Sequence, residues 1–427
     1  MTIVIFIGSL LGAMALGVPI AYALLLSGVA LMLHLDILEA QILAQAVING
    51  ADSFPLLAVP FFMLAGELMN VGGLSRRIIG LAMALVGHKR GGLGFVAIIA
   101  ATLIAALSGS AVADTAALAA FLLPMMVKAG HDKGRSAGLL ASAGIIAPII
   151  PPSIAFVVFG VAANLSITKL FLAGIVPGLL MATFLSVTWY VVAKKENIPQ
   201  QAKATRQELL DAFRKSVWAL FLPIIVIVGL RMGIFTPTEA AVVAAVYALV
   251  VSVLVYRELN LQQLYEVLVS AAQTTAVIMF LVASAMVSAW LITVAEIPMK
   301  LVEVLEPFMD NQTLLLIAMM ALVLLIGMVM DMTPIILIMT PVLMPVVKAA
   351  GIDPIYFGVL FVLNCAIGLI TPPVGTVLNV VTSVGKLKIE QSVKGIFPFL
   401  AAEVCVLLLL LVFPQIVIAP ARWFYGG

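Results

Sequence analysis

Small polar residues interrupt two long apolar stretches of this chain, where an apolar residue would cost least. Ser108, Gly109 and Ser110 lie within "LSGSAVADTAA", and Asp331, Met332 and Thr333 lie within "MVMDMTPII". Hydroxyl and carboxylate oxygens, together with unpaired backbone carbonyls, are ligands for small hard cations. A serine of this kind often only bonds back to its own helix. Two serines around a glycine at the first place, and Asp331 with Thr333 at the second, favour a cation site instead.

Two Pro-Pro pairs, Pro151-Pro152 and Pro372-Pro373, are a second feature that could bind cations. A proline lacks the amide donor and clashes with the carbonyl four residues earlier, so two in succession open a helix and leave carbonyl oxygens unpaired. A plain proline kink without a ligand is the alternative interpretation. Because the pairs occupy corresponding places in the two halves of the chain, we expect both to be cation-binding breaks.

Two carboxylates, Asp114 and Asp331, stand in matching frames, each ten residues before a proline, Pro124 or Pro341. A carboxylate at the centre of a membrane helix costs about 2.5–3.5 kcal/mol, so each needs a reason to be there. Coordinating a cation and closing a polar turn both remain open. Glu239 has a structural reason, because Thr236 to Glu239 has the pattern of a helix capping box with proline in the first turn.

The residue types needed for metal hydrolysis, ATP binding or disulfide bonding are sparse. His34, His88 and His131 fall at the ends of apolar segments, and Cys365 and Cys405 lie inside them. The chain contains neither an H-E-x-x-H zinc motif nor a G-x-x-x-x-G-K-[ST] phosphate loop. An intramembrane enzyme and direct coupling to ATP are therefore disfavoured.

The composition places these residues in a membrane. Of 427 residues, 64 % are hydrophobic and 10 % are charged, and the mean hydropathy is +1.26, whereas a soluble domain is about 25 % charged. At ~20 apolar residues per crossing, this length holds roughly a dozen membrane segments and no sizeable domain outside them. The net charge of +2 gives no argument for a nucleic-acid partner.

Two pairs of short apolar runs, at 92–127 and 314–347, have links of only a few residues. We interpret each pair as a re-entrant hairpin, because irregular backbone at membrane depth is tolerated only where protein or a water-filled cavity surrounds it. Two ordinary antiparallel crossings with a tight turn are the alternative. Broken crossings are expected at 137–161 and 356–380. The segment 3–33 is too long for a cleavable signal peptide and is expected to be the first transmembrane helix.

Lysine and arginine placement predicts the orientation. The base of the first hairpin carries seven basic residues, whereas the base of the second carries two: Arg76, Arg77, Lys89, Arg90, Lys128, Lys133 and Arg135, against Lys300 and Lys348. The first hairpin should therefore open to the cytoplasm and the second to the opposite side. The loop 194–215, rich in lysine and arginine, should also be cytoplasmic, and 35–52 should lie outside.

The same order of segments then occurs twice in opposite orientations. We expect one inverted repeat over 1–193, a cytoplasmic loop with a linking transmembrane helix over 194–235, and a second repeat over 236–427. Stretches 74–86 and 298–309 are expected to lie in the interface plane, with a short crossing as the alternative. Inverted-topology repeats with broken helices are typical of secondary transporters. The sequence thus predicts an all-α polytopic membrane protein, and a channel subunit is a weaker interpretation.

Four segments, "LSGSAVADTAA", "APIIPPSIAF", "FTPTEAA" and "TPPVGTVLN", make the chain resemble the large membrane (DctM-like) subunit of tripartite ATP-independent periplasmic (TRAP) transporters. The resemblance covers essentially the whole length. It implies import of an organic acid by symport with Na⁺, without ATP, across the bacterial inner membrane. The acid would be a dicarboxylate, a sialic acid or a sugar acid. It also implies an elevator motion and two partners, a small membrane subunit and a periplasmic substrate-binding protein.

The resemblance also implies site residues. The first Na⁺ site would use the tip Ser108, Gly109 and Ser110 with carbonyls near Ala147 to Pro151. The second would use Asp331, Met332 and Thr333 with Gly368, Thr371 and Gly375. The anionic substrate would lie near Ser153, Thr376 and Asn379, where helix N-termini offer amide donors. A stand-alone sodium–carboxylate symporter of similar architecture is the alternative, and the identity of the acid stays open.

Overall fold

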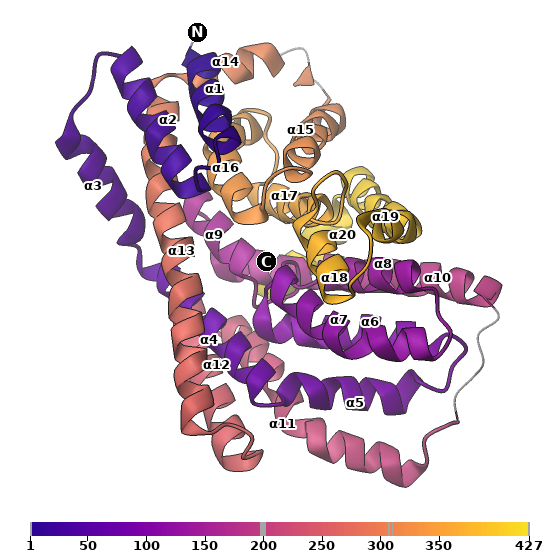
Figure 1. The fold of residues 1–427 in the computed structure, drawn as a ribbon. Helices are drawn as coiled ribbons and strands as arrows, with labels where there is room; N and C mark the ends of the chain where they lie inside the picture. Colours follow the sequence, from indigo (N-terminus) through magenta and orange to yellow (C-terminus); the bar gives the residue numbers. More distant parts are fainter. Residues whose placement is uncertain (1, 197–201, 306–307, 310, 426–427) are drawn as a thin grey trace.

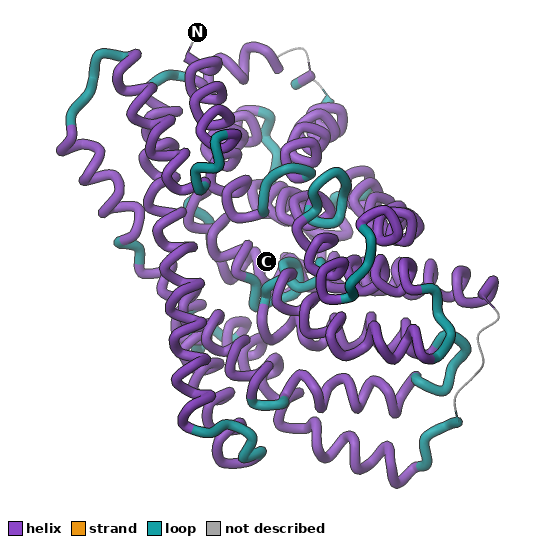
Figure 2. Tube along the Cα trace, in the orientation of Figure 1, coloured by secondary structure: helices purple, strands orange, loops and turns teal. Residues whose placement is uncertain are grey.

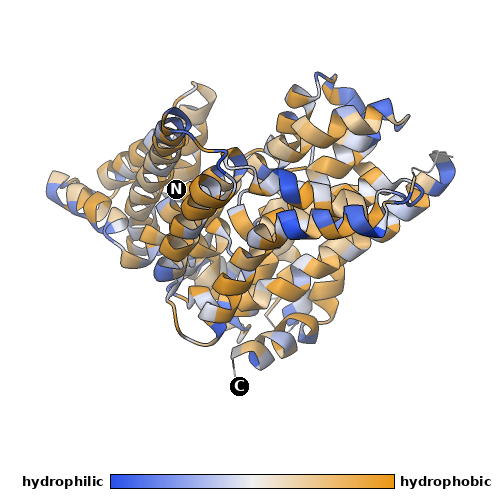
Figure 3. Cartoon of the chain, turned by 90° about the horizontal axis from the view of Figure 1, so that it is seen from below, coloured by the Kyte–Doolittle hydropathy of each residue, from blue (hydrophilic) through white to orange (hydrophobic). Residues whose placement is uncertain are grey.

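The computed structural model describes residues 2–196, 202–305, 308–309 and 311–425, and in these ranges all regular structure is helical, with no strand. Figure 2 shows helices throughout, joined by short loops. Eight helical stretches of the described residues are long and apolar enough to cross a membrane. Hydrophobic residues dominate the helix surfaces, and hydrophilic ones gather in a few segments (Figure 3). The prediction of an all-α polytopic membrane protein is confirmed.

The first half of the chain contains ten α-helices and one short 3₁₀ turn. Their bounds are α1 Thr2–Ala15, α2 Ile20–His34, α3 Ala40–Ala51, η1 Phe54–Leu57, α4 Ala58–Val71, α5 Leu74–Val86, α6 Gly92–Ser108, α7 Ala111–Lys128, α8 Lys133–Gly144, α9 Ile154–Ala163 and α10 Ile167–Glu196.

The second half also contains ten α-helices, together with a π-helical turn. Their bounds are α11 Arg206–Arg231, α12 Pro237–Val250, η2 Val251–Val255, α13 Leu261–Val294, α14 Ile297–Leu305, α15 Gln312–Gly327, α16 Met332–Ala349, α17 Pro354–Gly368, α18 Thr376–Val384, α19 Ile389–Val412 and α20 Gln415–Tyr425.

Both expected hairpins and both broken helices are present. Helices α6 and α7 form the first hairpin, and α15 and α16 form the second. The break between α8 and α9 covers 145–153, and the break between α17 and α18 covers 369–375. In Figure 1 the two hairpins lie on opposite sides of the broken helices, and α13 runs along one edge of the molecule.

Several expected boundaries were wrong. The segment 3–33 is two helices, because Gly17 adopts φ +82° and Pro19 precedes α2. The link 35–52 contains α3. The region after α10, expected to be a loop over 194–215, becomes helical at Arg206. Of that region, residues 197–201 lie outside the described residues. The apolar run 397–418 of the sequence, which looks like a single segment, contains the end of α19 and the start of α20 on either side of Phe413 and Pro414.

The two stretches expected in the interface plane are helices. The first matches α5, in which Ile78, Ile79 and Leu81 are buried while Arg76 and Leu85 are exposed. Arg77 fixes α5 to a distant segment, because its guanidinium donates to Glu258 Oε1 at 2.7 Å and stacks over the Tyr256 ring at 3.6 Å. The second becomes α14, which ends at Leu305. Residues 306–307 and 310 lie outside the described residues.

Small residues allow close helix packing around the hairpins. Trp189 of α10 is fully buried, and its indole N–H donates to Gly91 O at 2.7 Å. A Cβ on Gly94 would come within 2.0 Å of the Trp189 ring, so only glycine fits there. Because lipid does not drive helices together by the hydrophobic effect, close approach through small residues stabilises such contacts.

Candidate ion and substrate site

The tip of the first hairpin is a sharp turn built on glycine. Helix α6 ends at Ser108, Gly109 adopts φ +63°, and Ser110 is the N-cap of α7. A Cβ on Gly109 would lie 2.5 Å from Pro152 O and 3.1 Å from Ser153 Cα. The positive φ and the missing side chain thus bring this tip against the first break. On its other side Ser108 faces α4, where a Cβ on Gly66 would lie 3.2 Å from Ser108 Cβ.

Buried oxygens gather behind this tip. Ser108 donates its hydroxyl hydrogen to Asp114 Oδ1, and Ser110 N donates to Ser108 Oγ at 3.2 Å. Asp114 is 1 % exposed, and its Oδ2 has no hydrogen-bond partner among the described residues. Asp114 therefore shapes the tip with one oxygen and leaves the second oxygen for a further partner.

Thr115 is a site residue that the sequence analysis missed. Its hydroxyl oxygen is buried and, within the described ranges, has no hydrogen-bond partner. A Cβ on Gly144 would lie 1.7 Å from this oxygen, so the hydroxyl faces the end of α8, where the break begins. Thr115 thus adds an oxygen between hairpin and break. The only signal in the sequence is its place beside Asp114.

The first break is sealed within the protein, since all residues from 141 to 160 are buried, including Ala147 and Pro151. Ser153 is the N-cap of α9: its Oγ accepts from Phe156 N at 3.1 Å and donates to Pro148 O at 2.5 Å. The only hydroxyl hydrogen of Ser153 is therefore used inside the break. No hydrogen bond joins Ser153 to Thr376 or Asn379 in the described part of the chain.

The second tip also meets its break, with different contacts. Val374 N donates to Met328 O at 3.3 Å, and a Cβ on Gly368 would lie 2.8 Å from the Gly327 backbone. Asp331 is the N-cap residue of α16 but makes no side-chain capping bond. It accepts instead from Thr376 Oγ1 at 3.4 Å, across to the first turn of α18. Asp331 and Thr376, which are 45 residues apart in the sequence, thus lie side by side.

The other residues expected at the second site differ in their contacts and exposure. Thr371 donates to Ile367 O at 2.7 Å, a bond to its own helix end, and Gly375 adopts φ +48° before α18. Met332 is buried and Thr333 is half-buried in the first turn of α16. Asn379 is half-buried one turn into α18. The Thr371 hydroxyl uses its hydrogen in that bond, so its oxygen lone pairs and the backbone of the break remain available to a cation.

The second break is accessible, unlike the first. Pro373 and Val374 are exposed. Asp331 and Thr333 line a cavity of about 500 Å³ whose other residues come from the start of α2, the middle of α13 and Pro334: Pro19, Ile20, Ala21, Tyr22, Ala276, Val277, Ile278, Phe280 and Leu281. Apolar walls with a few convergent polar groups are typical of small-molecule sites.

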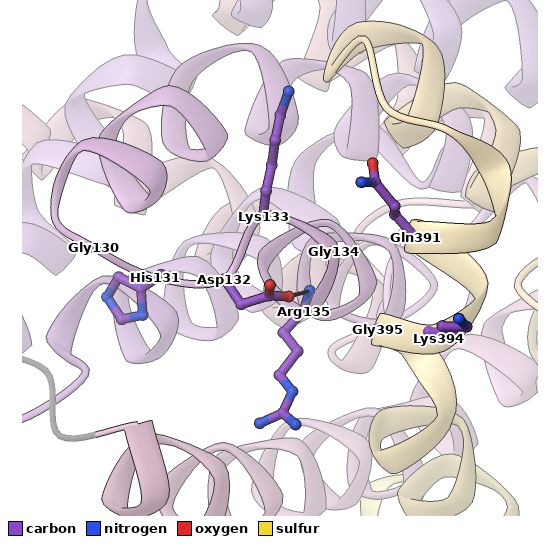
Figure 4. A pocket seen from close by; sticks show the side chains of 9 residues that line it. All are labelled: Gly130, His131, Asp132, Lys133, Gly134, Arg135, Gln391, Lys394 and Gly395. Carbon is purple, nitrogen blue, oxygen red and sulfur yellow. Dashed lines mark hydrogen bonds between the residues drawn. The ribbon is translucent and has the colours of Figure 1, made fainter.

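A larger cavity, of about 670 Å³, lies away from both tips. It opens over the start of α8 and the start of α19, and Figure 4 shows Lys133, Arg135 and Lys394 around it. His131, beside it, stacks on Trp189 with ring centroids 5.4 Å apart. Burial lowers the pKa of His131, so this imidazole is neutral at neutral pH. None of the residues expected at the ion or substrate sites lines this cavity.

Comparisons with known proteins agree with this architecture. The family model described as "Tripartite ATP-independent periplasmic transporter, DctM component" matches residues 7–416. The 2,3-diketo-L-gulonate TRAP transporter large permease protein YiaN of Escherichia coli is 58 % identical over 99 % of this chain and 100 % of its own. The sialic acid TRAP transporter large permease protein SiaM of Vibrio cholerae is 38 % identical over 98 % and 99 %.

A solved structure shares the fold. The Alcanivorax borkumensis YdaH transporter, described as having an unusual topology, superposes with a TM-score of 0.65 at 15 % identity. The match covers 92 % of this chain and 91 % of that one. The arrangement of hairpins and broken helices is therefore found in another transporter of very different sequence.

Proposed function

Because the chain belongs to the DctM component family of tripartite ATP-independent periplasmic transporters, we propose that it imports an organic acid across the bacterial inner membrane together with Na⁺. The observation that carries this proposal is the repeated contact between a hairpin tip and a helix break. At the first, Asp114 Oδ2 and Thr115 Oγ1 are buried without hydrogen-bond partners in the described ranges. Unwound carbonyls and carboxylate or hydroxyl oxygens suit a small monovalent cation.

At the first tip, Na⁺ would join the hairpin to the break. The ligands would be Asp114 Oδ2, Thr115 Oγ1 and carbonyls near Ala147 to Pro151. The tip backbone at Ser108 to Ser110 would close the site. A bound cation offsets the buried charge of Asp114 and supplies the missing partner of both side chains. This favours a closed hairpin when Na⁺ is bound.

At the second tip, Na⁺ binding and substrate binding would be coupled through charge. An organic anion approaching Thr333, Thr376 and Asn379 meets the Asp331 carboxylate, and like charges repel. Na⁺ beside Asp331, with the backbone of Gly368 and Gly375 as further ligands, removes that repulsion. The N-termini of α16 and α18 then favour the anion. Substrate affinity should thus depend on Na⁺ without a direct bond between the two.

Relatives guide the choice of substrate. The relative that is 58 % identical is named for 2,3-diketo-L-gulonate, a sugar acid, whereas relatives named for sialic acid and C4-dicarboxylates are 38 % identical. We therefore place sugar acids first among the organic acids to test. The proposal includes a small membrane subunit and a periplasmic binding protein as partners. It also includes an elevator movement of the hairpins and broken helices past the surrounding helices.

The test is uptake of a radiolabelled sugar acid into proteoliposomes that contain this chain and a small subunit, with a binding protein added outside. Uptake should require an inward Na⁺ gradient and the binding protein, and should need no ATP. Equal uptake in choline buffer would contradict sodium coupling. Full uptake without the binding protein would instead establish the stand-alone symporter.

A further inference from the structure

A cavity with positive charge lies where the first hairpin meets the end of α18. It has a volume of about 400 Å³. Two exposed lysines line it, Lys128 at the end of α7 and Lys133 at the start of α8. None of the described residues that line this cavity is acidic. Five residues of α7 give it an apolar wall: Ala119, Ala120, Leu123, Pro124 and Val127.

A glycine allows the close packing on the α18 side of this cavity. Gly385 is the C-cap residue of α18, and a Cβ there would lie 2.6 Å from Leu123 Cδ2 of α7. The end of α18 therefore packs closely on α7. Val384, the last residue of α18, also lines the cavity and is 39 % exposed. The cavity is thus bounded by packed helices and accessible from outside.

The charge around the cavity is unbalanced. Segments 128–135 and 386–394 adjoin it and carry six basic and two acidic residues: Lys128, Lys133, Arg135, Lys386, Lys388 and Lys394, against Asp132 and Glu390. Asp132 Oδ1 accepts from Arg135 N at 2.8 Å and so caps α8. Lys133 also lines the larger cavity of Figure 4, where the Lys133 and Arg135 side chains extend in opposite directions. A cleft lined by one sign of charge attracts ions of the opposite sign, here anions.

Helix α18 relates this cavity to the expected substrate residues. Thr376 begins the helix, Asn379 lies three residues later, and Ser383 lies four residues after Asn379. Residues spaced by three and four share a helix face, so these three give α18 one polar face. All three are half-buried or exposed. At 1.5 Å per residue, Val384 lies about 8 Å further along the helix than Asn379. The substrate residues and the cavity are therefore at the two ends of one short helix.

We propose that this cavity is a second anion site, which the organic acid occupies after it leaves the second tip. The inference rests on the proposed function, which assigns the anion to Thr376 and Asn379. The carboxylate binds through charge to the ammonium groups of Lys128 and Lys133, and the rest of the acid lies against the apolar α7 wall. Because these lysines supply the charge, binding here needs no Na⁺, in contrast to binding at the second tip.

The experiment uses the full-length chain without Cys365 and Cys405, purified in detergent, with one reporter cysteine at Val384. Val384 is exposed enough to react with a polar maleimide, and an anion bound in the cavity should slow that reaction. The probes are gluconate as a sugar acid, sorbitol as its neutral analogue, and mixed micelles of phosphatidylglycerol as an anionic lipid. A reporter cysteine at exposed Ala349, at the end of α16, controls for effects on the reagent.

Gluconate should slow labelling of Val384→Cys in the millimolar range, equally with and without Na⁺. Sorbitol should not slow it, and gluconate should not slow labelling of Ala349→Cys. Lys128→Gln and Lys133→Gln should each weaken the protection about two- to fivefold, as for exposed ion pairs, and Lys133→Arg should retain it. Lys348→Gln is the matched control and should change nothing, because Lys348 lies in the last turn of α16 as Lys128 does in α7.

No protection by gluconate, or equal protection by sorbitol, would overturn the anion site, and protection by phosphatidylglycerol alone would show a lipid groove instead. In proteoliposomes, Lys128→Gln combined with Lys133→Gln should lower the maximal uptake rate severalfold and leave the Na⁺ concentration for half-maximal uptake unchanged. An unchanged rate would remove the cavity from the exit route. A parent protein without sodium-coupled uptake would contradict the proposed function, whereas the labelling needs neither Na⁺ nor transport and decides the anion site separately.

Discussion

At the scale of single residues, the two tips differ in how their carboxylates are used. Asp114 is sealed behind the first hairpin and accepts from Ser108. Asp331 stands beside a cavity and reaches Thr376 on another helix. In the proposed function, the first carboxylate holds an ion within the protein, and the second lies where an ion and an organic anion affect each other.

Removing the first carboxylate charge should weaken Na⁺ binding while leaving the fold in place. Asp114→Asn should raise the Na⁺ concentration for half-maximal uptake at least about tenfold, because interactions with a charged group contribute about 1.5–3 kcal/mol and 1.4 kcal/mol is tenfold. Thr115→Val, with the hydroxyl replaced by a methyl group, should raise it less. Sodium titrations of uptake provide the measurement, with Glu67→Gln as control. Unchanged titrations for both variants would remove these two residues from the site.

The second carboxylate should control coupling rather than ion affinity alone. With Asp331→Asn, an organic anion no longer meets a negative charge in the absence of Na⁺. Substrate binding to the purified protein should then depend much less on Na⁺ than in the parent. Thr376→Val, which loses the bond to Asp331 but keeps the charge, should retain the dependence. Calorimetric titration with and without Na⁺ measures both, and equal sodium dependence in Asp331→Asn and the parent would contradict the charge argument.

The site could be predicted from sequence only where its residues are neighbours in the chain. The tips and the Pro-Pro breaks have local signals: small polar residues within apolar runs, and prolines in succession. Thr115 was missed because its role depends on Gly144, 29 positions later, which brings the end of α8 against its hydroxyl.

At the scale of elements, one helix start was predicted from its capping box and another was missed. The capping box at Thr236 was predicted and is present: Glu239 N donates to Thr236 Oγ1 at 3.3 Å, and Thr236 N donates to Glu239 Oε2 at 2.8 Å. A second capping box, at Thr205, was not predicted. It starts α11 within a stretch that was expected to be a loop because of its charged residues. The many charged residues around Thr205 favoured a loop in the prediction, although Thr205 and Glu208 have the capping-box pattern.

Close helix approach at the second tip depends on a missing side chain. Gly368→Ala would place a Cβ 2.8 Å from the Gly327 backbone, and such overpacking costs about 1–3 kcal/mol. Gly12→Ala in α1 is the control, because a Cβ there meets nothing within 4 Å and alanine favours helix by about 1 kcal/mol. Thermal unfolding in detergent should show the first variant destabilised and the second unchanged or stabilised. Equal stabilities would show that the tip relaxes freely.

At the scale of the whole molecule, hydropathy and repeated prolines were sufficient for the architecture, because membrane segments must satisfy their backbone internally and only helices do so in a chain of this pattern. The position of α3 and the division of 3–33 and 397–418 could not be read in this way. Apolar content continues through those turns, and the geometry depends on Gly17, Pro19 and Pro414 in their packed surroundings.

The opposite orientation of the two hairpin bases remains a prediction, and exposed positions now allow a clean test. Lys133 and Ala349 are both exposed, whereas His131 is buried and unsuitable for labelling. Single cysteines at Lys133 and Ala349, without Cys365 and Cys405, should react with an impermeant maleimide from opposite sides of intact cells. Ala349→Cys should label from outside, and Lys133→Cys only after permeabilisation. Labelling of both from one side would contradict the inverted arrangement.

The two breaks differ in exposure, and this difference predicts the order in which bound ions exchange. All residues from 141 to 160 are buried, whereas Pro373 and Val374 face outward near a cavity that contains Asp331. A Na⁺ ion at the first break could exchange only after the first hairpin has moved. An ion beside Asp331 could exchange without that movement. The first ion to load should therefore be the last to leave. If Na⁺ binds at both places as proposed, its slow release from the first break would keep the first hairpin closed while the substrate exchanges at the second break.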